Sequence, residues 1–312
     1  MPYTDQPAIR VHDVYKRYGD VRAVRGVSFD VAHGEVFCLL GPNGAGKTTV
    51  AEIVEGHRVP TSGAVCVLGY DPARGDRALR DRIGVVLQVG GIQEELTVGE
   101  VLEMHARWYS RSLAPDALID LVELDAKRDT PTGDLSGGQR RRLDLALGLV
   151  GDPDVLFLDE PTTGFDPHAR RAAWSTIRSL CSTGKTVFLT THFMDEAQYL
   201  ADRVAVMVNG QIVASGPPQA LGGRDELPTE IRFALPQAVA LGDLPDLPGC
   251  AVSEDAGEVL ITTSEGLATT HALTTWALER AIGLRRFSVS QPTLEDVYLA
   301  LTEHTTPEEA SR

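Results

Sequence analysis

The stretch VFCLLGPNGAGKTTV, Val36 to Val50, decides the fold class. The apolar run VFCLL suits a central strand that is buried on both faces. GPNGAGKT then matches GxxxxGK[ST], and TVAEIVEGH continues at helical spacing. In that order the glycines let backbone N–H groups converge on phosphate oxygens, and the helix adds its positive N-terminal dipole. We therefore expect a nucleotide phosphate to bind here rather than an ordinary glycine-rich turn. The expected binding residues are Gly41, Pro42, Asn43, Gly44, Ala45, Gly46, Lys47, Thr48 and Thr49.

Charged and hydroxyl groups near this loop suit phosphate chemistry. Lys47 would neutralise the β- and γ-phosphates, and Thr48 would offer its hydroxyl to Mg²⁺. Asp159 ends the buried strand VLFLDE, at the edge where open α/β sheets bind ligands. A carboxylate there can hold Mg²⁺, and the adjacent Glu160 can polarise a water for attack on the γ-phosphate.

Two further polar residues follow predicted strands. His192 comes after VFLTT and can reach the γ-phosphate, whereas Gln88 comes after IGVVL and can touch Mg²⁺ or water. Each of them alone would be an ordinary surface or structural residue. Tyr18 is our candidate for stacking on the base, with Tyr15 as its competitor. Because the chain has no NKxD element, adenine is the favoured base.

The chain divides into regions of different character. Residues 8–40 read as strands, residues from about 89 to 150 as a helical subdomain, and α/β alternation then resumes, which predicts a parallel sheet with antiparallel additions. We place an α/β domain at 1–216, a Gly/Pro-rich linker at 217–228, a small α+β domain of βαββαβ order at 229–303 and a disordered tail at 304–312. The segment PQAVALGDL is expected to form one of the helices of the small domain.

Composition excludes several classes of protein. The chain has 312 residues, a net charge of −15 and no apolar run near the ~20 residues that span a bilayer. Such an acidic balance argues against a nucleic-acid-binding surface, since each phosphate contact needs local positive charge. MPYTDQPAIR lacks the apolar core of a signal peptide, and the four cysteines have no metal-site spacing, so buried reduced thiols are expected.

A second anion-binding pattern lies far from the first. In LSGGQRRRLDLA, Leu135 to Ala146, a serine and two glycines precede a helical pattern, which suits an anion at the helix N-terminus. The arginines Arg140 to Arg142 are interpreted as a solvated or interface-facing turn of that helix rather than as phosphate ligands.

Taken together, these elements resemble the nucleotide-binding subunit of ABC transporters over residues 8–216. The resemblance implies a P-loop NTPase fold with a RecA-like core, an antiparallel β subdomain and a helical subdomain. It implies that GPNGAGKT is the Walker A loop, that Asp159 of the Walker B strand handles Mg²⁺, and that Glu160 is the catalytic base. It also identifies an A-loop aromatic, a Q-loop glutamine, a D-loop aspartate and a switch histidine, which are Tyr18, Gln88, Asp166 and His192.

The same resemblance implies a dimer. Two subunits of this family pair head to tail, so each ATP lies between one Walker A loop and the partner's LSGGQ signature. The residues expected to reach the partner's ATP are Ser136, Gly137, Gly138, Gln139 and Asp166. The D-loop reads GFDP, with Phe165 where leucine is commoner, which leaves the fine packing of that interface open.

The C-terminal segment QPTLEDVYLALT and the helix QRRRLDLA resemble the daunorubicin-resistance type of exporter ATPase. That implies drug or natural-product efflux through a separate ABC-2 type permease, and a cytoplasmic location on the inner face of the membrane. An importer subunit is one alternative. A nucleic-acid-associated or ribosome-associated ABC ATPase is another, although such proteins usually carry two signature domains, long coiled-coil insertions or basic linkers.

Overall fold

The computed structural model describes residues 6–86, 91–181, 184–223, 227–236, 239–255, 257–291 and 293–303. The chain forms two compact units, Met1–Pro218 and Gln219–Arg312. Gln88 and the tail 304–312 lie outside the described residues, as does part of the predicted linker. Within the described residues, no helix is both long and apolar enough to span a bilayer.

A six-stranded sheet forms the centre of the first unit, with strand order β5-β6-β7-β3-β8-β9. The first five run parallel, and β9 is antiparallel to β8. The strands are β3 (Val36–Leu40), β5 (Ile83–Val86), β6 (Val155–Asp159), β7 (Thr186–Thr191), β8 (Arg203–Val208) and β9 (Gln211–Gly216). Every residue of β3, β6 and β7 is buried, as expected for central strands of a parallel sheet. The predicted parallel sheet with an antiparallel addition is confirmed.

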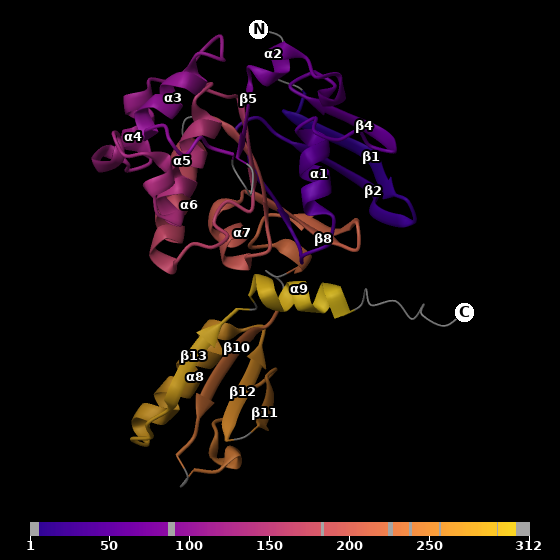
Figure 1. The fold of residues 1–312 in the computed structure, drawn as a ribbon. Coiled ribbons are helices and arrows are strands. Elements are labelled where there is room, and N and C mark those ends of the chain that lie inside the picture. Colours follow the sequence, from indigo (N-terminus) through magenta and orange to yellow (C-terminus); the bar gives the residue numbers. More distant parts are fainter. Residues whose placement is uncertain are drawn as a thin grey trace. The chain divides into compact units, whose positions relative to one another are not determined.

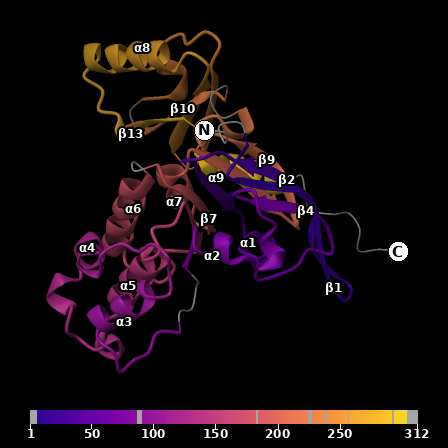
Figure 2. The same cartoon turned by 90° about the horizontal axis from the view of Figure 1, so that it is seen from above.

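Helices separate into two groups around the sheet (Figures 1 and 2). One group, α3 to α5, gathers away from α1 and the antiparallel strands. The helices are α1 (Lys47–Val54), α2 (Arg77–Arg80), α3 (Val98–Ala106), α4 (Pro115–Leu121), α5 (Gly137–Leu149), α6 (Pro167–Cys181) and α7 (Met194–Leu200), with short 3₁₀ turns at Pro72–Arg74, Asp125–Lys127 and Thr132–Asp134.

A smaller antiparallel sheet packs beside the parallel one, in the order β2-β1-β4. Its strands are β1 (Ile9–Tyr18), β2 (Val21–Val31) and β4 (Ser62–Val67). The two sheets share one apolar core, in which the ring of Phe29 stacks 4.8 Å from Phe37 and 5.8 Å from Phe188, measured between centroids. The position of the β3 end, where the glycine loop begins, is thereby fixed by packing on both sides.

One detail of the predicted helical region is wrong. Helical spacing in EVLEMHARWY predicts that His105, Trp108 and Tyr109 share one apolar face with Val101 and Leu102. Val101 and Leu102 are fully buried, but Trp108 remains 59% exposed. The helix ends at Ala106, so helical spacing no longer determines where the Trp108 ring points. That ring instead lies 4.3 Å from the His105 ring.

The second unit is a four-stranded antiparallel sheet with its own core. The strand order is β11-β12-β10-β13. Its elements are β10 (Thr229–Ala234), β11 (Ala251–Asp255), β12 (Glu258–Thr263), α8 (Gly266–Glu279), β13 (Arg285–Ser290) and α9 (Leu294–Glu303), with 3₁₀ turns at Leu221–Gly223 and Leu241–Asp243. Phe233, Ile261 and Leu273 are completely buried and, with Trp276, form the centre of the core.

All four strands predicted for this unit are confirmed, but the helix expected over PQAVALGDL is wrong. In the described part of that segment only Leu241–Asp243 is helical, as a single 3₁₀ turn. Gly242 and the prolines on either side disfavour a longer helix. Leu241 and Leu244 pack against the core, so the segment buries its leucines without regular structure.

Candidate functional site

The glycine loop is shaped by close approaches of the surrounding backbone. Gly44 and Gly46 have φ values of 82° and 103°, in the left-handed region that favours glycine. A Cβ atom on Gly41 would lie 2.2 Å from the Met207 carbonyl oxygen, and one on Gly46 would lie 2.4 Å from that of Ala23. A Cβ on Gly44 would meet no atom within 4 Å. The loop is therefore packed on one side and open on the other.

Backbone hydrogen bonds tether this loop to two other strand ends. The Gly41 N–H donates to the Thr191 carbonyl at 3.2 Å, and the Gly210 N–H donates to the Ala45 carbonyl at 3.0 Å. The Gly210 carbonyl in turn accepts from the Arg25 N–H at 2.8 Å. Asn209 and Gly210 both have positive φ, 49° and 81°, as a type I′ turn between β8 and β9 requires. The β8–β9 turn thus holds the glycine loop in place through this backbone hydrogen bond.

Lys47 is a nearly buried lining residue of an open pocket beside the glycine loop. Its side chain is 4% exposed, and Nζ donates to the carbonyls of Gly41 and Pro42 at 2.9 and 3.1 Å. Burial lowers the pKa of Lys47, whereas the charge of Glu160 raises it. The pocket has a volume of about 350 Å³ and is lined by Ala23, Asn43, Gly44, Gly46, Lys47, Thr48, Thr49 and Glu160. A cationic group and backbone N–H donors therefore line one side of it.

Two carboxylates follow one another at the end of β6. Asp159 is 6% exposed and accepts a hydrogen bond from the Thr190 hydroxyl. Burial raises the pKa of Asp159, and the Thr190 hydrogen bond opposes that shift. The Glu160 backbone has φ 48°, and its N–H donates to the Thr190 carbonyl at 3.0 Å. A non-glycine residue in this conformation costs about 1–3 kcal/mol, which is common at functional sites.

His192 and Lys47 meet the same carboxylate oxygen. Glu160 Oε1 lies 3.2 Å from His192 Nδ1 and 3.7 Å from Lys47 Nζ. His192 and Glu160 directly follow β7 and β6, and Lys47 begins α1 after the loop that follows β3. They meet because parallel strands bring their carboxyl ends to one edge. The sequence predicted this convergence for all three. Gln88, the fourth candidate at that edge, lies outside the described residues.

Tyr18 ends β1 with its ring 39% exposed. Lys16 Nζ lies 5.2 Å and Arg58 Cζ 5.5 Å from the ring centroid, within cation–π range. The competitor Tyr15 is similarly exposed, but its hydroxyl is packed so that a Cβ on Gly26 would lie 2.7 Å from it. Neither tyrosine lines the phosphate pocket.

The second anion-type loop is preorganised but lies apart from the phosphate pocket. Ser136 Oγ accepts from the Gln139 N–H at 3.3 Å, and Gln139 Oε1 accepts from the Ser136 N–H at 3.0 Å, forming a capping box at the start of α5. A Cβ on Gly137 or Gly138 would meet nothing within 4 Å. Asp166 Oδ1 accepts from the Ala169 N–H at 2.9 Å at the start of α6. Among the described residues, none of these side chains lines the pocket at Lys47.

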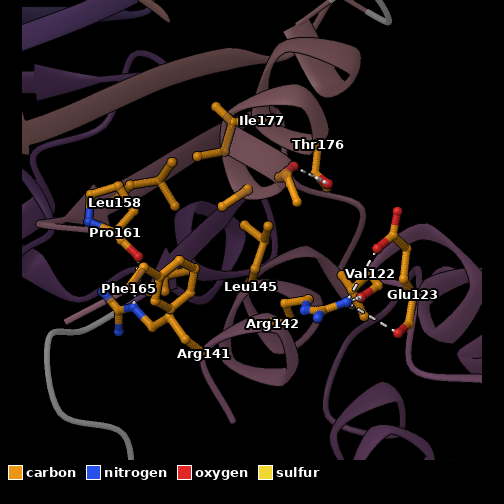
Figure 3. A pocket seen from close by; sticks show the side chains of 13 residues that line it. Val122, Glu123, Arg141, Arg142, Leu145, Leu158, Pro161, Phe165, Thr176 and Ile177 are labelled. Atoms are coloured by element: carbon orange, nitrogen blue, oxygen red, sulfur yellow. Dashed lines mark hydrogen bonds and ion pairs between the residues drawn. The ribbon is translucent and has the colours of Figure 1, made fainter. Parts of the chain in front are cut away.

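The interpretation of Arg140 to Arg142 as a solvated or interface-facing turn is wrong for Arg141, whereas the Arg140 and Arg142 side chains remain 33% and 31% exposed. Arg140 pairs with Glu94 and Arg142 with Glu123. Arg141 is 10% exposed and donates to the backbone at the end of β6. Figure 3 shows Arg141 beside Pro161 and Arg142 turned toward Glu123.

An apolar cavity lies beside these arginines, between α5 and α6 (Figure 3). Leu145, Leu158, Phe165 and Ile177 are among its lining residues. Its volume of about 20 Å³ is enough for roughly one water molecule and too small for an organic ligand. The open pocket at Lys47 is therefore the better candidate for a ligand site.

The sequence reasoning missed a buried glutamate close to these groups. Glu196 of α7 is completely buried, and its Oε1 accepts from the Thr162 hydroxyl at 2.7 Å and from Trp174 Nε1 at 2.9 Å. Thr162 follows Glu160 by two residues, so Glu196 links α6 and α7 to the turn after β6. A sequence signal existed, because Glu196 shares the buried side of α7 with Ala197 and Leu200.

The donor set fits a nucleoside triphosphate with a magnesium ion. Gly44 leaves an open backbone face, and Lys47 supplies a cation to phosphate oxygens. In the described part of the chain, no group of three or more His, Cys, Asp or Glu side chains has the arrangement of a metal site. Mg²⁺ typically binds through one or two carboxylates together with substrate phosphates. Asp159 and Thr48 are the protein groups suited to it.

Comparison with known proteins agrees with this geometry. Residues 24–163 match the family model described as ABC transporter, and residues 229–293 match that of the ABC transporter domain-containing protein-like, C-terminal domain. A Nod factor export ATP-binding protein I of Paraburkholderia xenovorans is 41% identical over 303 residues, covering 95% of this chain and 97% of that protein. That of Rhizobium sp. strain N33 is 46% identical over 219 residues, covering 69% and 72%.

Solved structures share the fold of the first unit. The ATP-binding subunit of an ABC transporter superposes with a TM-score of 0.62 at 26% identity, covering 68% of this chain and 90% of that one. A Clostridium perfringens protein that is part of an ABC transporter complex gives a TM-score of 0.61 at 28% identity, covering 69% and 90%. The P-loop NTPase fold of the ABC type, with an additional C-terminal domain, is thus confirmed. The chain belongs to the ATP-binding subunits of ABC transporters and is an ATPase.

Proposed function

We propose that two copies of this chain pair head to tail on ATP and power export of a hydrophobic drug or natural product through a separate ABC-2 type permease. The main support for the ATPase site is that Lys47 Nζ and His192 Nδ1 lie 3.7 and 3.2 Å from the same oxygen, Glu160 Oε1. A cation for the γ-phosphate and an imidazole beside a carboxylate form the set required for attack by a polarised water.

Each residue of the site has a role in this proposal. Tyr18 stacks on the adenine, Lys47 and the loop N–H groups hold the phosphates, and Glu160 is the general base that accepts the proton of the attacking water. His192 positions the γ-phosphate or that water, and Gln88 acts beside them. Thr48, Gln88 and Asp159 hold the Mg²⁺ ion, which neutralises phosphate charge when bound. The nucleotide ligands are Tyr18, Gly41, Pro42, Asn43, Gly44, Ala45, Gly46, Lys47, Thr48 and Thr49.

The partner's signature completes the site. Ser136, Gly137 and Gly138 form a capped helix N-terminus whose glycine face is open, and they line no part of their own chain's phosphate pocket. An anion brought by another chain would satisfy the N–H groups at that helix end. Gln139 and Asp166 belong to the same contact in this proposal.

The direction of transport rests on the relatives. Chains 41–46% identical to this one are named for Nod factor export, which favours export over import. The C-terminal unit, proposed at 229–303 after a linker at 217–228, would act with the permease on the inner face of the membrane. The proposed domain limits for the ATPase part are 1–216, with the helical subdomain at about 89–150.

Drug efflux with and without a working base tests the proposal. Cells that express the chain with its candidate permease are expected to extrude a fluorescent hydrophobic drug, and cells with the Glu160→Gln chain are expected not to. Accumulation that is the same in both strains would refute the coupling of hydrolysis to drug export. Substitution of Ser136 should reduce hydrolysis while ATP binding to the monomer stays intact; an equal loss of both would refute the cross-chain role of the signature.

A further inference from the structure

Arg141 connects the signature helix to the catalytic turn of the same chain. It lies in the second turn of α5, five residues after Ser136. Its Nε donates to the Pro161 carbonyl at 3.0 Å, and its Nη2 donates to the Asp159 and Glu160 carbonyls at 3.0 and 3.2 Å. One side chain thus binds the carbonyls of three consecutive residues, including both acidic residues of the site.

These contacts meet a structural need of the turn. The backbone leaves the sheet at Asp159, so the carbonyls that follow have no ladder partner and need other donors where they are buried. Glu160 also has a left-handed φ of 48°, a conformation that persists only when its surroundings fix it. A guanidinium carries five donors in a rigid fork and can bind several carbonyls at once. Asp144 Oδ2, 3.7 Å from Arg141 Nη1, balances the buried charge.

We propose that Arg141 is a positioning residue for hydrolysis, which holds the Asp159–Pro161 turn so that the Glu160 carboxylate faces Lys47 and His192. This inference rests on the proposed roles of Glu160 and Ser136. Since α5 begins at the residues proposed to contact the partner's ATP, a single helix joins that nucleotide to the chain's own catalytic base. Binding at one composite site is thereby coupled to the geometry of the other.

The first test separates nucleotide binding from hydrolysis. Arg141→Met keeps the length of the side chain and removes its donors. We expect kcat to fall about tenfold or more, because small displacements of a catalytic group are costly, and the Kd of the monomer for a fluorescent ATP analogue to change less than about threefold. Arg141→Lys, with a single donor group, should fold and give an intermediate kcat. A wild-type kcat in the Met variant would overturn the proposal, as would equal losses in affinity and kcat.

Arg142 provides a matched control on the same helix. Its Nη1 binds the Glu123 carboxylate at 3.2 Å and the Glu123 carbonyl at 3.3 Å, and no contact with the β6 turn is recorded for it within the described residues. Because Arg142 is 31% exposed and pairs with a Glu123 carboxylate that is 74% exposed, Arg142→Met should lower the thermal unfolding midpoint less than Arg141→Met does and leave kcat within about twofold of wild type. If both variants lost kcat to the same degree, the effect would come from general destabilisation, which would refute the positioning role.

Mixed dimers test the coupling between chains. When Arg141→Met and Ser136→Ala sit on opposite chains, one composite site takes both changes and the other stays intact, so about half of the wild-type rate is expected. When both changes sit on one chain, each site takes one change and the rate should fall much further. The reverse ranking would overturn an action of Arg141 on its own chain's Glu160.

The outcomes also distinguish this inference from the proposed function. Failure of differently tagged chains to co-purify in the presence of ATP would refute head-to-tail pairing and, with it, the coupling between sites. The effect of Arg141→Met on kcat, compared with its effect on the Kd for the ATP analogue, would then still report on the Asp159–Pro161 turn within one chain. Normal hydrolysis by Glu160→Gln would refute the proposed base itself, independently of the result for Arg141.

Discussion

His192 Nδ1 lies 3.2 Å from Glu160 Oε1, and the two residues come from neighbouring parallel strands. The imidazole therefore contacts the carboxylate on which the proposed water activation depends. Lys47 Nζ approaches the same oxygen at 3.7 Å, so Glu160 Oε1 is shared by the two side chains that we propose act on the γ-phosphate. Binding of a nucleotide is expected to draw Lys47 toward phosphate and leave Glu160 and His192 to the attacking water.

Substitution of the base should separate binding from turnover. Glu160→Gln keeps the shape of the side chain and removes its proton-accepting charge, so hydrolysis should fall about 100-fold or more. ATP binding should persist, and the dimer should accumulate with ATP and Mg²⁺. Light scattering after size-exclusion chromatography, together with phosphate release, measures both effects. A variant that stays monomeric and turns over normally would contradict the assignment.

The open glycine face of α5 predicts an unusual mutant. A Cβ on Gly137 would meet no atom within 4 Å, and alanine favours a helix over glycine, so Gly137→Ala should fold at least as stably as wild type. The added methyl group would nevertheless keep the partner's phosphate from the helix end. We expect hydrolysis to drop several-fold with an unchanged thermal midpoint. Gly41→Ala is the contrasting variant, because its Cβ would lie 2.2 Å from the Met207 carbonyl, and it should lose stability as well.

Stability should depend on pH through Glu196. Burial raises the pKa of Glu196 above its ordinary value of 4.5, and hydrogen bonds from Thr191, Thr162 and Trp174 only partly oppose the shift. Between the ordinary and the raised pKa the folded chain binds more protons than the unfolded chain, so this residue lowers the free energy of unfolding as pH rises. Glu196→Gln removes that dependence.

The comparison to make is therefore the difference in unfolding free energy between Glu196→Gln and wild type. It should grow in favour of the variant as pH rises from about 4.5 and level off above the raised pKa. Urea unfolding at several pH values measures it. A difference that is constant with pH would show that Glu196 titrates normally. Arg170, whose charge favours ionised Glu196, must be left intact in both chains.

The two units should unfold in separate transitions, because each has its own hydrophobic core. Leu273→Ala opens a cavity in the fully buried core of the second unit and should cost about 2–5 kcal/mol of its unfolding free energy. Leu267→Ala, on the same helix but 89% exposed, should change stability by less than about 0.5 kcal/mol. Calorimetry should show one transition shifted and the ATPase transition unmoved. A common shift of both transitions would indicate that the units unfold together.

The sequence predicted well the positions of residues that are set by the local order of strand, loop and helix. Glu160 and His192 come directly after buried strands, and Lys47 ends a glycine loop that follows another. Because the carboxyl ends of parallel strands share one edge, their convergence could be inferred without coordinates. The Asn209-Gly210 pair is a similarly local signal for a turn, since few dipeptides tolerate two successive positive φ values.

Contacts between distant segments could not be read in this way. Arg141 resembled its neighbours Arg140 and Arg142 in sequence. Within the described parts of the chain it is the one of the three that binds the β6 turn, because the orientation of α5 against the sheet decides which side chain points inward. Glu196 likewise depends on the packing of α6 and α7. The prediction for Trp108 was wrong because of local structure: α3, which would have directed its ring toward the core, ends two residues earlier.

The hydrogen bond from the Gly210 amide to the Ala45 carbonyl gives the protein an internal reporter. Ala45 belongs to the phosphate loop, whereas Gly210 lies more than 160 residues later, in a turn outside the pocket. Bound nucleotide should make the phosphate loop more rigid and thereby slow deuterium uptake at the Gly210 amide. No label has to be placed in the phosphate pocket. Loading of the ATPase could be followed in this way inside an intact transporter, where the phosphate loop itself is covered.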